Sequence, residues 1–137
     1  MSKFKFGNRS KEKLDGVDER VKMLCEKALK YSTVDFSVID GLRTQSEQKA
    51  MFDKGASELD GQMFVSDHQL GLAIDVIPYV GGLDPWDVEN VDVKLAYMEM
   101  YRAFMRASMK LGMLLEFGFG YNIGGGRDWP HISVKQM

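Results

Sequence analysis

Apolar positions recur along the chain at two different periods, and these periods predict alternating helices and strands. From residue 10 to residue 31 they recur every three or four residues, which places them on one face of a helix. From residue 35 to residue 40 the pattern changes to a period of two, typical of a half-buried strand. The helical stripe consists of Leu14, Val17, Val21, Leu24, Ala28 and Tyr31.

A short helix is predicted next by its end signals. Residues 44–47 have the Thr-x-x-Glu form of a capping box, in which each end of the motif bonds the backbone of the other. The helix should continue through residues 50–52 and end at Gly55. Residues 56–67 show no periodicity, so we expect a loop there.

A second strand, from Gly71 to Val80, turns an aspartate away from the core. The bulky residues at positions 72, 74 and 76 share one face and should be buried. Asp75 therefore shares the opposite face with Gly71 and Ala73. These two small neighbours leave room beside the carboxylate for a metal ion and a substrate.

The longest helix is predicted over residues 92–112. Its Met-rich aromatic stripe is interpreted as core packing and not as a cofactor site, whereas Arg102, Arg106 and Lys110 mark the solvated side. The central stripe is Tyr97, Tyr101, Phe104, Ser108 and Leu111, flanked by Met98, Met100 and Met105.

Two further strands complete the prediction. Residues 114–119 suggest one, and residues from 131 onward another, with His131, Ser133 and Lys135 on its polar face. No helix pattern follows the glycines at 124–126, which argues against a phosphate-binding loop. Helices and strands in irregular order, without a repeat or linker, predict one α+β domain over residues 1–137.

Composition and charge narrow the function. The formal charge of −2 gives no basic surface for nucleic acid, so no nucleic-acid partner is expected. No apolar run reaches the ~18 residues of a membrane span, and the N-terminus lacks the apolar centre of a signal peptide. We therefore expect synthesis in a cytoplasm, no membrane insertion, and a monomer. The single cysteine, Cys25, excludes an internal disulfide and should be a buried, unreactive thiol.

The chain has only two histidines, His68 and His131. His68 stands just before the strand predicted from Gly71, His131 lies on the polar face of the last predicted strand, and both are expected on the side opposite the core. Two imidazoles and one carboxylate form the ligand set of an open zinc site. Asp75 could supply the carboxylate. These residues alone leave open whether the histidines bind a metal or are ordinary polar side chains.

Two motifs add a resemblance to a known family. Ser66-x-His68-x-x-Gly71-x-Ala73-x-Asp75, followed by Asp128-x-Pro130-His131, resembles the zinc peptidases that cut peptidoglycan peptides. This family includes D-Ala-D-Ala carboxypeptidases and dipeptidases, and the L-alanyl-D-glutamate endopeptidases used by phages as endolysins. The segment 41–44 after a strand, and the chain length, look most like the phage branch. The resemblance implies a small antiparallel sheet packed with about three helices, with Zn²⁺ bound on the sheet face.

The same resemblance implies roles for individual residues. It makes His68, Asp75 and His131 the zinc ligands and Asp128 the catalytic acid/base. Many carboxypeptidase members carry the longer glutamate at that position, so Asp128 favours the endolysin branch.

Three further residues belong to the site by resemblance. Arg43 would orient the substrate and stabilise developing negative charge. Ser66 would hydrogen-bond the substrate or a ligand, although a simple turn residue is equally consistent with its position. Trp129 is placed with the substrate-binding residues.

We therefore expect a zinc-dependent peptidoglycan endopeptidase that hydrolyses a stem-peptide amide, the L-Ala-D-Glu bond, by attack of a zinc-bound water with Asp128 as base. Such an enzyme would act on the wall after the host membrane is opened, without a separate wall-binding domain. Alternatives are a D,D-carboxypeptidase with the same site, a non-catalytic metal-binding module, and a structural role in a virion. A purely structural metal site would have no use for Asp128.

Overall fold

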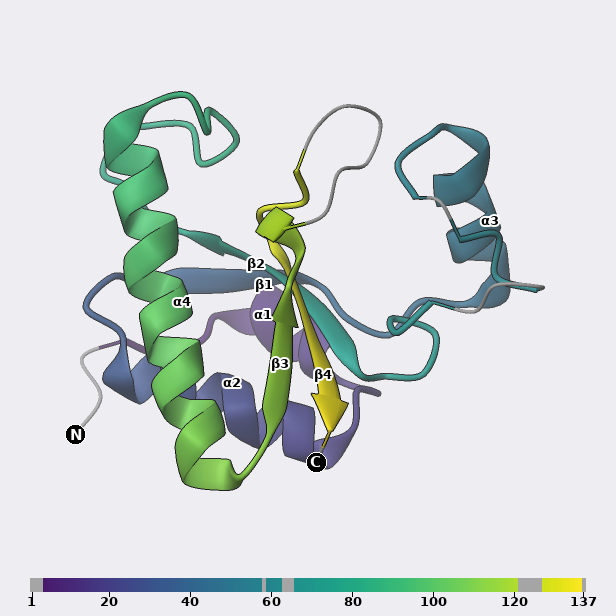
Figure 1. Cartoon of the computed structure of the whole chain (residues 1–137), viewed down its shortest axis with the longest axis horizontal. Helices are drawn as coiled ribbons and strands as arrows, with labels where there is room; N and C mark the ends of the chain where they lie inside the picture. The colour runs from purple at the N-terminus through teal and green to yellow at the C-terminus, as the bar shows by residue number, and fades with distance from the viewer. Residues whose placement is uncertain (1–3, 58, 63–65, 121–126, 137) are drawn as a thin grey trace.

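The computed structural model describes residues 4–57, 59–62, 66–120 and 127–136, and it confirms the α+β class. Four strands form one antiparallel sheet in the order β1-β2-β4-β3; most of the helices pack against the sheet, and one short helix stands to one side of it (Figure 1). In chain order the elements are α1 (Asn8–Leu14), α2 (Glu19–Tyr31), β1 (Phe36–Asp40), α3 (Gln45–Asp53), β2 (Ala73–Pro78), α4 (Val91–Leu111), β3 (Leu114–Phe117), the 3₁₀ turn η1 (Gly118–Gly120) and β4 (His131–Gln136).

One core lies between α2, α4 and one face of the sheet. Alternate residues of β2 and β4 point into it, for example Ile74 and Ile132, which pair across the two strands. Cys25 of α2 is completely buried in the same core, as expected, and burial raises the pKa of its thiol. None of the described helices is long and apolar enough to cross a membrane.

The single helix predicted over residues 10–31 is wrong, because the chain forms two helices there. Gly16 adopts a left-handed φ of +90°, which interrupts the helix. Asp18 then begins α2, and its carboxylate accepts a hydrogen bond from the Arg20 N–H. This break accounts for the fourth helix, and α1 turns back to cover the free edge of β1, where Ser10 accepts from the Val38 N–H.

Other boundaries also differ from the prediction. β2 begins at Ala73 because Gly71, at φ +71°, lies in the preceding turn and accepts from the Asp18 N–H. The strand predicted over 114–119 stops at Phe117 and continues as η1. Met98 and Met105 of α4 are exposed and do not flank the core as expected. The predicted glycine loop at 124–126 lies outside the described residues.

The short helix α3 is confirmed in detail. The Thr44 side chain accepts from the Glu47 N–H, and the Glu47 carboxylate accepts from the Thr44 N–H, which completes the capping box. Gly55 follows the helix at φ +78°. The described parts of 56–67 contain neither helix nor strand, as predicted.

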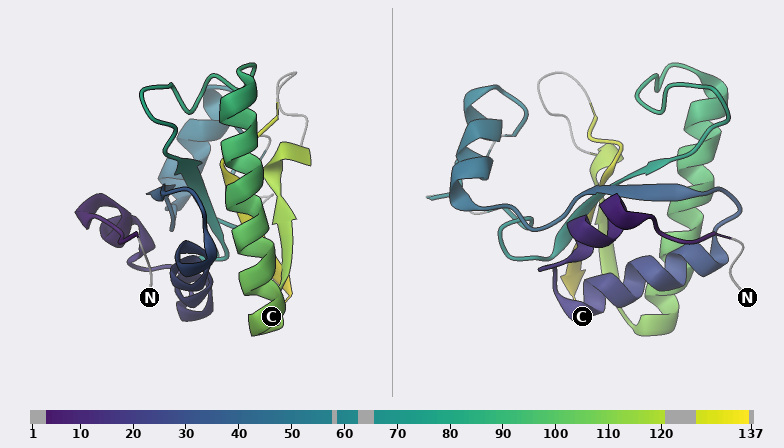
Figure 2. Two further views of the ribbon diagram at one scale, coloured as in Figure 1. Left: turned by 90° about the vertical axis from the view of Figure 1, so that its left-hand side faces the viewer. Right: turned by 180° about the vertical axis from the view of Figure 1, so that it is seen from behind.

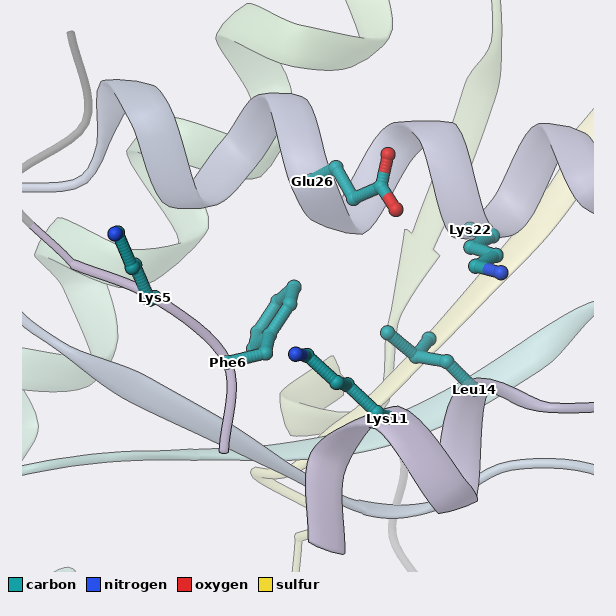
Figure 3. Close-up of a pocket in the computed structure, with 6 residues that line it drawn as sticks. All are labelled: Lys5, Phe6, Lys11, Leu14, Lys22 and Glu26. Atoms are coloured by element: carbon teal, nitrogen blue, oxygen red, sulfur yellow. The ribbon is translucent and has the colours of Figure 1, made fainter. Parts of the chain in front are cut away.

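A cavity of about 510 Å³ opens where the N-terminal segment meets α1 and α2. Three lysines, Glu26, Phe6 and Leu14 line it, and the side chains surround an open space in Figure 3. None of the candidate site residues named above belongs to this cavity, so it is distinct from the histidine-containing region.

Gly41, directly after β1, is a position where only glycine fits. A Cβ there would lie 2.0 Å from the Lys13 carbonyl oxygen of α1. Gly41→Ala should therefore separate α1 from β1 and lower the free energy of unfolding by about 1–3 kcal/mol. Thermal or urea unfolding measures this loss. Gly81→Ala is the matched control, because no atom lies within 4 Å of its Cβ position; equal stability of both variants would contradict the tight contact.

Candidate metal centre

Three separate segments meet at the non-core face of the sheet. His68 lies in the turn before β2, Asp75 lies within β2, and His131 is the first residue of β4. The strand register pairs Asp75 directly with His131, and Asp40 of β1 lies beside Asp75 on the other side. The antiparallel pairing thus brings together residues 56 positions apart, and the 66–72 turn folds His68 onto them.

The three side chains form a nearly regular triangle of potential ligand atoms. His68 Nε2 lies 3.2 Å from His131 Nδ1 and 3.3 Å from Asp75 Oδ1, and the third side is 3.5 Å. In a tetrahedral zinc site, ligand atoms about 2.0–2.1 Å from the metal lie roughly 3.3–3.4 Å apart. The observed triangle therefore has the size of one face of such a tetrahedron.

An unpaired oxygen supports the same conclusion. Asp75 Oδ1 is buried and has no hydrogen-bond partner in hydrogen-bonding geometry, although both imidazoles lie beside it. Leaving a buried polar atom unpaired is unfavourable unless something else compensates. A cation bound by the three residues would supply the missing interaction, so the donor set and the unpaired oxygen both fit a metal ion.

The second nitrogen of each histidine is fixed by a neighbour. His68 Nδ1 donates to the Gly41 carbonyl at 2.8 Å, which leaves Nε2 as the lone-pair nitrogen facing the cluster. His131 Nε2 lies at hydrogen-bond distance from the hydroxyl of Ser133, which is completely buried. Such partners orient metal ligands and fix their tautomer. The sequence reasoning assigned no role to Gly41 or Ser133, although the position of Ser133, two residues after His131 on the same strand face, was a usable signal.

The Asp75 carboxylate and the neighbouring imidazoles stabilise each other's charged forms. Burial alone would raise the pKa of Asp75, but the two imidazoles outweigh burial and hold this pKa well below its usual range. Burial alone would lower the pKa of His68, and the Asp75 carboxylate outweighs it and raises that pKa. Without a metal, the anionic carboxylate therefore favours a protonated imidazole, and protons compete with metal ions for these ligands.

Asp128 lies on the turn that leads into β4. Its carbonyl accepts from the His131 N–H, and its own N–H donates to the Gly118 carbonyl. A Cβ on Gly118 would lie 2.4 Å from the Asp128 carbonyl oxygen, so η1 packs against this turn with no space for a side chain. Burial, and then the nearby Asp75 carboxylate, raise the pKa of the Asp128 carboxyl. Its half-buried carboxyl thus lies within electrostatic range of the cluster.

Arg43 is buried next to the cluster and is bonded by other side chains. One terminal nitrogen donates to Gln48 Oε1 and the other to Asp40 Oδ2, both at 2.6 Å. The second nitrogen also lies 4.0 Å from Asp75 Oδ2. Gln48 in turn donates to Ser57 Oγ and to the Leu59 carbonyl, which ties the loop after α3 to the site. Sequence reasoning did not anticipate that Asp40 and Gln48 would bind Arg43.

The remaining two residues have structural contacts. The buried Ser66 hydroxyl accepts from the Gln69 N–H, as expected of a turn residue. Trp129 is half-buried among aromatic rings, with centroids 5.5 Å from Tyr97 and 5.8 Å from Phe119, and its carbonyl accepts from the Tyr101 hydroxyl. Each residue lies two positions before a histidine of the cluster, and their binding to a substrate stays a prediction.

Comparisons with known proteins agree with this geometry. Residues 1–132 match the family described as phage L-alanyl-D-glutamate peptidase. The L-alanyl-D-glutamate peptidase of Escherichia phage T5 is 33% identical over 134 residues, which cover 97% of this chain and 90% of that protein.

Two solved structures are also similar. The crystal structure of Serratia marcescens L-Ala D-Glu endopeptidase ChiX matches with a TM-score of 0.76 and 30% identity, over 97% of this chain and 92% of that one. The vancomycin-resistance D,D-dipeptidase VanXYg shares the fold, with a TM-score of 0.51 and 18% identity over 86% of this chain and 48% of that one. The match over nearly the whole chain, together with the cluster on the sheet, shows that this chain belongs to the phage L-alanyl-D-glutamate peptidase family.

Proposed function

We propose that this protein is a zinc-dependent peptidoglycan endopeptidase that hydrolyses the L-Ala-D-Glu bond of the stem peptide. The observation that carries the proposal is the His68–Asp75–His131 triangle, with Asp128 on the turn three residues before one of its corners. Membership in the phage L-alanyl-D-glutamate peptidase family supports the substrate and the bond. The described chain acts as one catalytic domain in this proposal.

His68 Nε2, His131 Nδ1 and Asp75 Oδ1 would hold the zinc ion. When bound, zinc supplies Lewis-acid chemistry, because it lowers the pKa of a coordinated water toward ~7 and polarises a carbonyl. Three protein ligands leave the fourth tetrahedral position open, as in catalytic rather than structural zinc sites.

Asp128 is the proposed general base and acid. Its carboxylate accepts a proton as water attacks the scissile amide, and it returns the proton to the leaving amine. A cation beside it would oppose the effects of burial and of Asp75, and would lower its pKa toward the ionised, proton-accepting form. Both histidines are already used as ligands, so the assigned base must come from the carboxylates.

Arg43 is proposed to place positive charge beside the reacting amide. Its guanidinium is fixed by Asp40 and Gln48, and a fixed donor stabilises developing negative charge without having to reorganise. Ser66 and Trp129 are proposed to contact the substrate at the edges of the site.

The bond is identified by digesting purified peptidoglycan and determining the new termini by mass spectrometry. New N-terminal D-Glu and C-terminal L-Ala are expected. Release of D-Ala would instead identify a D,D-carboxypeptidase, and intact peptides in the presence of zinc would support a non-catalytic metal-binding module.

Removing a ligand should remove the metal. His68→Ala and His131→Ala should each lose most of the roughly one zinc per chain expected in the wild type, because two ligands bind zinc far more weakly than three. Elemental analysis of the purified proteins measures this. Asp15→Ala, which removes an exposed carboxylate between α1 and α2, should retain full zinc content. Full occupancy in both histidine variants would exclude the proposed site.

Asp128→Asn keeps the size of the side chain but removes the basic oxygen. It should retain zinc and melting temperature and lose activity by about 10²–10⁴-fold, the usual contribution of general acid–base catalysis. Peptidoglycan turnover and zinc content are measured together. Asp53→Asn, on the exposed side of α3, is the matched control. Loss of zinc in Asp128→Asn would identify Asp128 as a ligand, and full activity would exclude it as the base.

Arg43→Ala should lower turnover while the zinc stays bound, since a cation cannot itself be a ligand. It should also lower the free energy of unfolding by about 1–3 kcal/mol, because Asp40 and the buried Gln48 lose their partner. Activity, zinc content and urea unfolding are compared with those of Arg20→Ala, which removes an exposed arginine paired with Asp18. Unchanged turnover in Arg43→Ala would show that Arg43 has no role in the reaction.

A further inference from the structure

The outer face of α4 carries an apolar stripe that nothing in the described chain covers. Its apolar members are between 43% and 82% exposed, although each is a large side chain. Figure 2 (left) shows α4 running along the front of the molecule with no other element before it. The stripe, hereafter the α4 stripe, consists of Val91, Leu95, Met98, Arg102, Met105 and Met109.

The α4 stripe lies opposite the side of the helix that packs in the core. The buried face of α4 contains Val93, Met100 and Ala107, half a turn away from the stripe. Burial of α4 in its own domain therefore does not explain the stripe. Isolated exposed apolar residues are normal, but a contiguous apolar surface marks an interaction site.

The spacing of the α4 stripe is that of a helix pair. Successive members are separated by four, three, four, three and four residues, which is the a/d pattern of a coiled coil. This average of 3.5 residues keeps a seam facing one partner helix over several turns. The single charged member, Arg102, lies near the middle, where a charged group can fix the register.

The distribution of charged residues beside the α4 stripe indicates that the partner helix is α4 of a second copy of the chain. On one flank the N-terminal half carries Asp92 and Glu99, and the C-terminal half carries Arg106 and Lys110. Glu99 accepts from Thr33, and Arg106 stacks over the Tyr31 ring at 4.2 Å, so both charges are held in place. This flank is complementary to itself when two copies of the helix run antiparallel.

We propose that two copies of this chain associate through the α4 stripe, with their α4 helices antiparallel about a two-fold axis near residue 100. In this register Leu95 faces Met105 of the other copy, and Asp92 faces Arg106 and Lys110. The two Glu99 carboxylates meet near the axis, where each lies 3.8 Å from Arg102 of its own helix. A two-fold interface is self-complementary in this way. The pairing goes beyond the proposed hydrolysis and replaces the monomer expected from the sequence.

The acidic half of the flank distinguishes this partner from a membrane surface. A helix that lies on anionic lipid carries basic residues along its polar face. Asp92 and Glu99 would be repelled there, whereas in the antiparallel dimer Asp92 faces basic residues of the other copy and Glu99 keeps Arg102 of its own helix. The candidate metal centre lies on the face of the sheet opposite the core that α4 covers, so the proposed pairing through the outer face of α4 leaves both centres open to a polymeric substrate.

Sedimentation analysis across a range of protein concentrations tests the association. The wild type should shift from the 15.5 kDa of one chain to twice that mass. Leu95→Glu combined with Met105→Glu should stay at one chain mass at every concentration. Met23→Glu, an exposed apolar position on α2 outside the stripe, is the matched control and should still associate. Circular dichroism checks that each variant is folded.

A wild type that stays at one chain mass throughout would overturn the proposal, as would association that survives the double glutamate variant. Reversing the signs of the charges on the flank gives a second test that leaves the α4 stripe unchanged. Asp92→Lys should weaken the association, and adding Arg106→Glu and Lys110→Glu to it should restore the association. Weakening without restoration would exclude the antiparallel flank pairing.

Disulfide formation tests the direction of the helices. Leu95→Cys and Met105→Cys proteins should cross-link when mixed under oxidation, and neither should cross-link alone. The native Cys25 is buried and provides a low background. Cross-linking of each variant alone, and not of the mixture with each other, would show parallel helices and overturn the antiparallel arrangement.

Discussion

A buried carboxylate oxygen between two imidazoles is the interaction around which the candidate metal centre of this protein is built. Asp75 Oδ1 has no hydrogen-bond partner, and the two histidines approach it to 3.3 and 3.5 Å. An unsatisfied buried polar group costs about 1–3 kcal/mol, and more when it is charged. The rest of the fold must therefore hold this arrangement in place, and a bound cation would remove the cost. An unpaired buried polar atom of this kind calls for a functional explanation such as a bound ion.

The scaffold holds the cluster through close contacts at small residues. Gly41 allows α1 to contact the chain after β1, and its carbonyl fixes the His68 ring. Gly118 allows η1 to contact the turn that carries Asp128 and leads to His131. The completely buried Ser133 lies at hydrogen-bond distance from the His131 ring. The residues that position the proposed ligands are therefore constrained in size by their neighbours.

Comparison of the two similar solved structures separates similarity of fold from similarity in the bond that is cut. The D,D-dipeptidase at 18% identity shares the fold only, which says nothing about the bond that this chain cuts. The endopeptidase at 30% identity matches over almost the whole length of both chains. Under the proposed function, a difference of bond within the same fold comes from residues around the candidate metal centre, and Arg43, Ser66 and Trp129 are the first positions to compare.

The sequence by itself determined the strand faces, and with them the side of the sheet on which Asp75 and His131 lie; the roles of the other candidate residues came from the family resemblance. A period of two places Asp75 on the face opposite Ile74 and Val76, and the same rule places His131 and Ser133 together. The α+β class followed from the two periods, and the capping box of α3 from local bonds between residues three apart. These features depend on neighbours in the chain, so they can be deduced without the fold.

Only the tertiary structure decided which partners those faces meet. The position of Arg43 beside the cluster depends on its N–H donating to the carbonyl of His68, a residue 25 positions away, and its guanidinium lies 4.0 Å from Asp75 Oδ2. The packing of the turn between α1 and α2 against the turn before β2 depends on the bond from the Asp18 N–H to the carbonyl of Gly71, a residue 53 positions away. Helical period likewise gives the angle of Met98 and Met105 around α4 but not what covers them. Long-range contacts decide these features because the local sequence is compatible with more than one neighbour.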